Sequence, residues 1–167
     1  QSTLETRQDE ARKRLDELAQ VRSETGSAVP RPVLDRYEFI RRRLRLDYQP
    51  LDRTVVTDAK WLGFVVEQVL SNALKYTASG SVTIAMDGDD LCIRDTGIGI
   101  APEDLPRIFD RGYTGRNGRT HRQASGIGLY LCRRICRDLG HTITAASAVG
   151  EGTVIRLDLS RRTGPLE

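Results

Sequence analysis

The sequence lacks the signatures of several common classes of protein. No apolar run approaches the roughly 18 to 20 residues that a membrane-spanning helix needs, and residues 1–14 are polar and charged, unlike a signal peptide. The chain as given is therefore expected to be soluble. Cysteine occurs only three times, and an odd count argues against a framework of disulfides.

Two of the cysteines raise the question of a metal site. Cys132 and Cys136 stand four residues apart on a predicted helix, where two metal ligands are conceivable. No nearby His or further Cys completes a set of four ligands, and Cys92 lies in an apolar alternation typical of a small core residue. Metal binding by these cysteines is not expected.

The familiar phosphate-binding motifs are also missing. The sequence contains no G-x-x-x-x-G-K-S/T loop. Its glycine pair Gly126 and Gly128 follows a loop rather than a strand, and no third glycine arrives at the spacing of a dinucleotide-binding turn. Any nucleotide site must therefore be of another kind.

Charge gives little information about partners. The 26 Lys and Arg residues against 23 Asp and Glu leave a net charge of +3. The densest cluster, Arg41–Arg45, is interpreted as a solvated helix face, with a phosphate or anionic-lipid patch as the alternative. No aromatic residues are interleaved with it, so nucleic acid is not an expected partner.

What is present fits one compact domain with a small appendage. The 167 residues are 38% hydrophobic and 29% charged, which is ordinary for a globular protein. Residues 1–24 carry one apolar helical stripe, and Gly26, Ser27, Pro30 and Pro32 interrupt it. We therefore divide the chain into a helical linker or coiled-coil segment (1–32), a catalytic or binding domain (33–160) and a flexible tail (161–167).

Strands and helices alternate in the central domain. The patterns predict strands at 44–48, 54–56, 82–86, 91–94, 141–146 and 153–159. They predict helices at 33–43, 58–76, 102–109 and 126–139, with a polar glycine-bearing loop at 112–125.

The helix predicted at 58–76 has an apolar face and a polar seam. Gln68, Asn72 and Lys75 follow one another at spacings of four and three, which places two amides and an ammonium on neighbouring turns. This arrangement suits a magnesium ion and the phosphates attached to it. Taken alone, the same residues are as readily explained as a solvated helix face.

Two glycine turns follow. Asp95–Ile100 comes directly after a buried strand, where glycines allow a ligand to approach the backbone and the carboxylate can accept the amine of a purine. Ser125–Leu129 leads a loop into a helix whose first amides suit an anion. Each could also be a plain turn.

Two further features could contribute to such a site. The hydroxyl of Thr153, after Gly150 and Gly152, could join Asp95 in binding adenine through water, although a hairpin turn explains this glycine pattern equally well. Basic residues in the predicted loop and directly before it could close over a triphosphate: Arg111, Arg116, Arg119 and Arg122.

Taken together, these segments resemble the N, G1, F, G2 and terminal glycine boxes of histidine kinases. The matching segments are Glu67–Tyr76, Asp95–Ile100, Ile108–Phe109, Gly126–Leu129 and Gly150–Thr153. The resemblance spans about residues 44–160. It implies the Bergerat fold, an α/β two-layer sandwich with a mixed sheet of about five strands covered by about three helices.

The resemblance also implies roles for individual residues toward ATP and Mg²⁺. Asn72 would coordinate magnesium, Lys75 and Tyr76 would contact phosphate and nucleoside, and Asp95 would select adenine. Arg111 would steady the transferring phosphate, and Gln68 and Lys75 are grouped with it as candidate catalytic residues. Further contacts to the nucleotide would come from Gly97, Ile98, Gly99, Ile100, Tyr113, Thr114, Ser125, Gly126, Ile127, Gly128, Leu129 and Thr153.

Two departures from the family pattern bear on the activity. Gln68 stands where hydrolytic relatives have a Glu that activates water, and an amide cannot be that base. Glu67 lies about 100° around the helix, so phosphoryl transfer is favoured over hydrolysis. The acceptor motif, a His followed by an acidic residue and Pro, is absent, because His121 and His141 do not fit it.

The expected activity is therefore half of a protein-histidine kinase reaction. The expected partners are a dimerisation segment carrying the acceptor His and a response regulator. This domain is expected to lie in the cytoplasm. The parent protein is expected to be anchored in the membrane and to have a membrane sensor or a transporter as a partner. The stretch Phe109–Gly115 with Gly128–Cys132 resembles, more narrowly, kinases that sense antimicrobial peptides.

Two other functions remain as alternatives. The first is a stand-alone serine kinase of the anti-sigma type, which Gln68 disfavours because a carboxylate there would suit hydroxyl activation better. The second is a pseudokinase that binds nucleotide or a protein partner without catalysis, which the intact N, G1 and G2 elements argue against.

Overall fold

The computed structural model describes residues 44–49, 55, 57–115 and 126–160. The predicted segments 1–32 and 33–43, the tail 161–167 and most of the predicted strand 54–56 lie outside these residues. Ser125, His121, Arg116, Arg119 and Arg122 also lie outside them.

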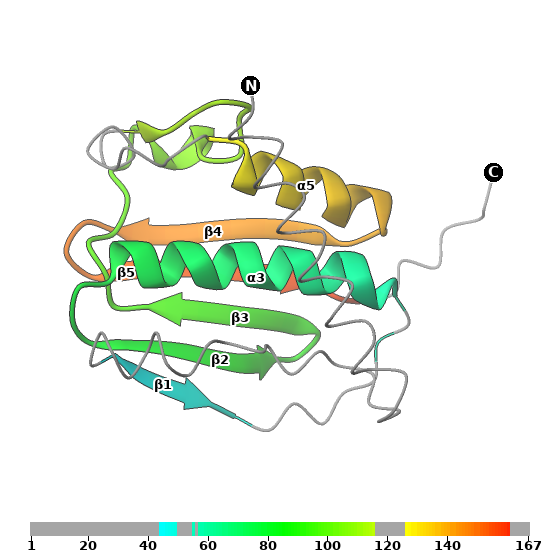
Figure 1. Cartoon of the computed structure of the whole chain (residues 1–167), viewed down its shortest axis with the longest axis horizontal. Helices are drawn as coiled ribbons and strands as arrows, with labels where there is room; N and C mark the ends of the chain where they lie inside the picture. The colour runs from blue at the N-terminus through cyan, green and yellow to red at the C-terminus, as the bar shows by residue number, and fades with distance from the viewer. Residues whose placement is uncertain (1–43, 50–54, 56, 116–125, 161–167) are drawn as a thin grey trace, which may run out of the picture.

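One mixed sheet of five strands forms the first layer (Figure 1). The strands are β1 (Arg45–Tyr48), β2 (Ser81–Asp87), β3 (Asp90–Asp95), β4 (Thr142–Ala148) and β5 (Gly152–Asp158), in the order β1-β2-β3-β5-β4. β1 pairs with β2 in parallel, and the other neighbours are antiparallel.

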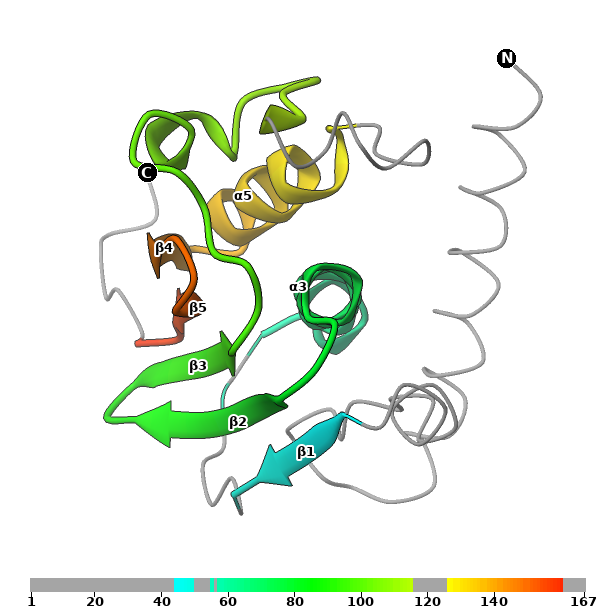
Figure 2. The same ribbon diagram turned by 90° about the vertical axis from the view of Figure 1, so that its left-hand side faces the viewer.

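Within the described residues, the second layer consists of two α-helices, α3 (Ala59–Tyr76) and α5 (Gly128–Asp138). Figure 2 shows α3 end-on, with the sheet curving past it and α5 beside it on the same face of the sheet. The structure thus has the two-layer α/β architecture that was predicted from the sequence.

Helix α3 is positioned by its cap and its apolar face. The carboxylate of Asp58 accepts the backbone N–H groups of Lys60 and Trp61 at 3.0 and 3.2 Å, which satisfies two amides at the helix start. Its buried side chains are Leu62, Val65, Val66, Val69, Leu70 and Ala73. Each of the larger ones stabilises the fold by about 1.5 to 3 kcal/mol.

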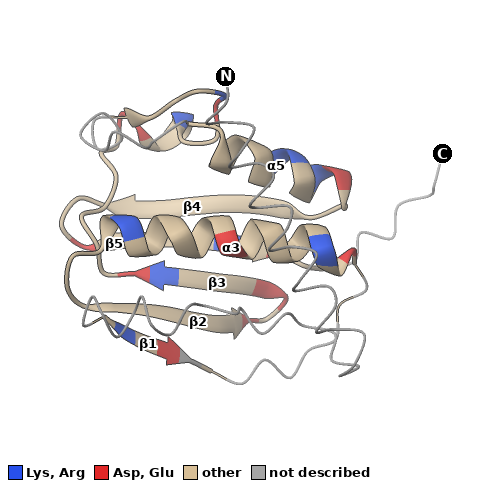
Figure 3. Ribbon diagram, in the orientation of Figure 1, with Lys and Arg blue, Asp and Glu red and all other residues tan. Residues whose placement is uncertain are grey.

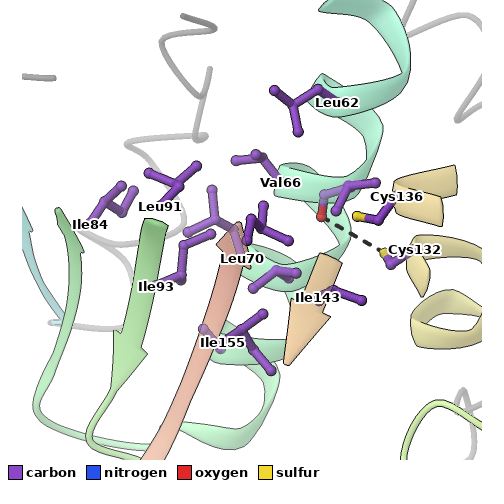
Figure 4. Packing of buried hydrophobic residues seen from close by; sticks show 14 of the residues in the cluster. Leu62, Val66, Leu70, Ile84, Leu91, Ile93, Cys132, Cys136, Ile143 and Ile155 are labelled. Atoms are coloured by element: carbon purple, nitrogen blue, oxygen red, sulfur yellow. Dashed lines mark hydrogen bonds between the residues drawn. The ribbon is translucent and has the colours of Figure 1, made fainter. Parts of the chain in front are cut away.

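The two free cysteines of α5 belong to this core. Cys132 and Cys136 are 0% and 1% exposed, and the thiol of Cys132 donates to the Val65 carbonyl at 3.9 Å (Figure 4). Burial raises the pKa of the Cys136 thiol to about 11 and raises that of Cys132 further. Both are structural thiols that let α5 approach α3 closely.

The residues 102–109 differ from the predicted helix. They contain one 3-10 turn, η1 (Leu105–Arg107), flanked by turns. Pro106 lies inside this segment and has no N–H, so an α-helical bond at that position cannot form. The segment is held by hydrogen bonds between residues three apart, such as the one from the Asp104 N–H to the Ala101 carbonyl at 2.9 Å.

Among the described residues, no helix is long and apolar enough to cross a membrane.

Candidate functional site

The helix-covered face of the sheet is apolar except at one end. Successive rows across β3, β5 and β4 contain Leu91, Leu157 and Ile143, then Ile93, Ile155 and Ala145. The next row contains Asp95, Thr153 and Ser147, each directly opposite the next in register. Cross-strand partners point to the same face of the sheet. Three polar side chains therefore take the place of apolar core residues at this end of the strands, here called the polar edge.

Several other elements meet at the same edge. Figure 1 shows there the end of α3, the end of β3, the turn between β4 and β5 and the beginning of α5. In Figure 3, β4 carries no Lys, Arg, Asp or Glu, whereas acidic and basic residues mark the end of β3 at this edge. The predicted N, G1, G2 and glycine boxes therefore come together in space.

Asp95 is the charged residue of the polar row. Asp95 is 9% exposed. Its Oδ1 accepts hydrogen bonds from the backbone N–H groups of Gly97 at 2.9 Å and Thr153 at 3.2 Å. Oδ2 has no hydrogen-bond partner among the described residues. Burial raises the pKa of this carboxyl above its usual range, and the two amide bonds only partly oppose that effect.

Gly97 allows the turn after Asp95 to lie against the end of α3. A Cβ at this position would lie 2.3 Å from the carbonyl oxygen of Tyr76, a distance that no side chain can accept. The contact is closed by the Ile98 N–H, which donates to the same carbonyl at 3.1 Å. The G1 turn is thereby fixed to the N-box helix.

The same turn is tied to the hairpin between β4 and β5. Gly99 has φ +73°, and a Cβ there would meet the Ala148 carbonyl oxygen at 2.1 Å. The Gly150 N–H donates to the Ile98 carbonyl at 2.8 Å, and the Ile100 N–H donates to the Ser147 hydroxyl at 2.8 Å. Turn and hairpin form one rigid wall next to Asp95.

The polar seam of α3 lies partly buried. Gln68, Asn72, Lys75 and Tyr76 are all half-buried. The Asn72 amide makes no hydrogen bond to any described residue, so its oxygen is available to a cation. The Lys75 ammonium lies 5.2 Å from the centre of the Tyr76 ring, and burial raises the pKa of that phenol.

Gln68 faces the beginning of α5. A Cβ on Gly128 would lie 2.9 Å from the Oε1 of Gln68, so the amide packs against the first turn of that helix. The N-cap position of α5, Ile127, provides no side-chain hydrogen bond, in contrast to Asp58 on α3. The first amides of α5 therefore remain available to an anion.

Gly126 and Gly112 join the segments on either side of residues 116–125. The Gly112 N–H donates to the Gly126 carbonyl at 2.9 Å. Gly126 has φ +66°, and a Cβ there would lie 2.5 Å from the carbonyl carbon of Gly112. The turn after η1 is thus anchored at the entrance to α5.

Three predicted site residues, Arg111, Tyr113 and Thr114, make no hydrogen bond or ion pair with Asp95 or Asn72. Arg111 is exposed and makes no ion pair with any described residue. Tyr113 donates its hydroxyl to the carboxylate of Asp104, and its ring lies 4.4 Å from the guanidinium carbon of Arg107. Thr114 is half-buried nearby, while Ser125 lies outside the described residues.

Two residues near the site were not identified from the sequence. Ser147 lies in the polar row, and Thr77 is 1% exposed with a hydroxyl that has no partner among the described residues. The period-two series Ile143, Ala145 and Ser147 was a usable signal, because it places the serine on the inward face. Nothing local in the sequence distinguished Thr77 from a polar helix end.

The sequence is similar to a known family and to sensor histidine kinases of two bacteria. Residues 57–163 match the family described as histidine kinase-, DNA gyrase B-, and HSP90-like ATPase. The chain is 42% identical over 111 residues to the sensor histidine kinase YxdK of Bacillus subtilis strain 168. It is 41% identical over 111 residues to the sensor protein kinase GraS of Staphylococcus aureus strain JH1.

These alignments cover 63% and 64% of this chain but only 34% and 32% of the relatives. The chain therefore spans about a third of the length of the curated relatives it matches.

Solved structures share the fold. The mycobacterial sensor histidine kinase MprB superimposes with a TM-score of 0.61 at 24% identity, over 73% of this chain and 87% of that one. Full-length ShkA in complex with AMPPNP gives a TM-score of 0.58 at 22% identity, over 86% and 28% of the two chains. At these identities the likeness concerns the fold alone.

Proposed function

The chain belongs to the histidine kinase-, DNA gyrase B-, and HSP90-like ATPase family, and from this premise we propose that it is the ATP-binding catalytic domain of a sensor histidine kinase. It binds ATP and presents the γ-phosphoryl group to a histidine on a separate dimerisation segment. The observation that carries the proposal is the buried carboxylate of Asp95, whose second oxygen has no partner among the described residues.

A carboxylate in this position selects an amine. Its Oδ1 is occupied by two backbone N–H groups, so Oδ2 is left as an acceptor in a partly apolar environment. An ionised carboxylate can only accept hydrogen bonds. It therefore favours the exocyclic amine of adenine and opposes the carbonyl of guanine.

The phosphates of the nucleotide would lie at the end of α3 and the first turn of α5. The open first turn of α5 offers backbone amides and the positive end of a helix dipole, and Lys75 adds a positive charge. Asn72 offers one oxygen, which suits Mg²⁺ because this ion usually keeps few protein ligands beside phosphate oxygens and water. Bound Mg²⁺ would neutralise charge on the phosphates.

Gln68 favours transfer over hydrolysis. It packs against Gly128 with its amide oxygen and has no group that could take a proton from water at neutral pH. A histidine nitrogen needs no such base, because its neutral ring already carries a lone pair. That nitrogen forms a bond to the γ-phosphorus as the bond to the ADP oxygen breaks.

The parent protein and its partners follow from the same premise. We propose a parent with an acceptor-histidine segment and a response regulator, anchored in a membrane with this domain in the cytoplasm. A membrane sensor or a transporter would supply the signal. The resemblance of Phe109–Gly115 with Gly128–Cys132 to kinases that sense antimicrobial peptides supports a parent of that subgroup.

The test is a transfer reaction in two parts. The chain is mixed with γ-labelled ATP, Mg²⁺ and a dimerisation segment that carries the acceptor histidine, taken from a relative such as YxdK. We expect label on the segment that is lost in acid and retained in base. The control segment has the acceptor histidine replaced by Gln and should remain unlabelled.

Other outcomes assign the alternatives. Acid-stable label on a serine of a partner would replace the histidine kinase by a serine kinase. Binding of ATP by calorimetry without any transfer to the segment would leave a nucleotide-binding pseudokinase. Absence of heat with both ATP and ADP would overturn the nucleotide site itself.

A further inference from the structure

Ser147 lies at the centre of the wall that holds Asp95. Its hydroxyl receives the Ile100 N–H at 2.8 Å, lies 2.8 Å from the Gly152 carbonyl oxygen and lies 2.9 Å from the hydroxyl of Thr153. These three contacts join the turn after β3, the hairpin and β5. Thr153 in turn donates its backbone N–H to Asp95.

The proton count determines the direction of each bond. A serine hydroxyl has one proton and two lone pairs. The Ile100 N–H donates to one lone pair of the Ser147 oxygen. The Gly152 carbonyl can only accept, so the serine hydroxyl must donate its proton to that hydrogen bond. The contact with Thr153 is then a hydrogen bond only if the threonine hydroxyl donates into the second lone pair.

A threonine held in this way has no proton left to offer a ligand. Its oxygen presents lone pairs alone and lies in the same row of side chains as the carboxylate of Asp95. The two neighbouring groups then have the same polarity, because both accept hydrogen bonds. A ligand or a bridging water next to them must donate.

We propose that Ser147 is a positioning residue for nucleotide selection, which fixes the Thr153 hydroxyl as an acceptor next to Asp95 and so makes the polar row favour an amine. This inference rests on the proposed function, since it assumes that adenine lies against this row. Ser147 itself touches the wall and acts through Thr153.

The proposal predicts a change in selectivity when the hydroxyl is removed. In Ser147→Ala, the Thr153 hydroxyl is free to rotate and can donate to a carbonyl. Calorimetric affinities should be compared for ATP and for inosine triphosphate, which has a carbonyl oxygen in place of the amine. We expect the ratio of the two affinities to fall by about threefold to tenfold, the effect of about one hydrogen bond.

Two matched variants separate this role from general loosening of the wall. Ser147→Thr keeps the hydroxyl and should restore the wild-type ratio. Thr144→Ala removes a hydroxyl from the exposed face of the same strand and should leave the ratio unchanged. A Ser147→Ala protein that loses both affinities by the same factor would overturn the proposal, because a purely structural role predicts that result.

A second variant protects the test from poor folding of Ser147→Ala. Thr153→Val removes the acceptor while keeping the shape of the side chain, and it should reduce the same ratio by a similar factor. An unchanged ratio in Thr153→Val would also overturn the inference. Failure of the wild-type chain to bind ATP would instead count against the proposed function.

Discussion

The ionised carboxylate of Asp95 lowers the stability of the fold and is available to a ligand. The side chain is largely buried, and desolvation raises its pKa despite two amide bonds. A pKa that is higher in the folded than in the unfolded chain means that ionisation lowers stability. This contribution is favourable below the ordinary pKa of 3.8 and is lost as the pH rises through the higher folded value.

Asp95→Asn should therefore stabilise the domain and abolish its selectivity. The amide oxygen can keep both bonds to Gly97 and Thr153, while the NH₂ group replaces the acceptor that adenine needs. We expect a higher melting temperature at neutral pH and ATP binding weakened by about 10- to 100-fold, as for a charged hydrogen bond. Thermal unfolding and calorimetry measure the two effects.

The pH dependence provides the control for this variant. The gain in melting temperature should shrink as the pH falls through the folded pKa of Asp95 toward 3.8, and it should be smallest below 3.8, because the wild-type carboxyl is then neutral as well. A gain that persists unchanged in acid would contradict an origin in ionisation.

At the scale of elements, local signals identified more than long-range ones. The cap at Asp58 and the glycines after β3 were readable because they depend on neighbours in sequence. Asp95 and Thr153 were predicted to act together, but Ser147 beside them was missed, since its place in the row depends on the register of β4 against β5. The predicted helix at 102–109 was wrong because Pro106 has no N–H to donate to a helical hydrogen bond.

The two glycines before and within the first turn of α5 should respond differently to substitution. Gly126→Ala imposes a left-handed conformation on alanine, at a cost of about 1 to 2 kcal/mol, and places its methyl group against the backbone of Gly112. Gly128→Ala meets only the flexible end of Gln68. There, alanine gains about 0.5 to 1 kcal/mol in helical propensity.

We therefore expect Gly126→Ala to lower the urea midpoint of unfolding, and Gly128→Ala to leave it unchanged or raise it. ATP affinity should fall in both, because in Gly128→Ala the methyl group and the displaced Gln68 narrow the space at the helix start. Equal destabilisation by the two substitutions would show that Gln68 cannot give way.

At the scale of the whole molecule, the structure separates the candidate site from the opposite end of the sheet. That end is held by His141, which is 8% exposed and whose Nε2 lies 2.9 Å from the Thr57 hydroxyl. The contact links the chain before α3 to the start of β4. Burial lowers the pKa of this imidazole, and the nearby carboxylate of Asp158 only partly opposes the effect.

The stability of the whole fold should consequently fall in mild acid. The unfolded chain takes up a proton at His141 near pH 6.5, whereas the folded chain does so only at lower pH. Stability is therefore full above pH 6.5 and is lost as the pH falls through the folded pKa. The free energy of unfolding in urea, measured between about pH 7.5 and about pH 5.5, should decline, and His141→Asn should flatten that decline.

The other histidine of the sequence, His121, gives the matched control. If His141 causes the decline, His121→Asn leaves the decline as it is in the wild-type chain, and a loss of the decline in that variant would contradict the assignment. At each pH the ATP affinity of folded His141→Asn should equal that of the wild-type chain, because His141 acts at the end of the sheet away from Asp95. A decline that survives in His141→Asn would show that the acid sensitivity does not originate at His141.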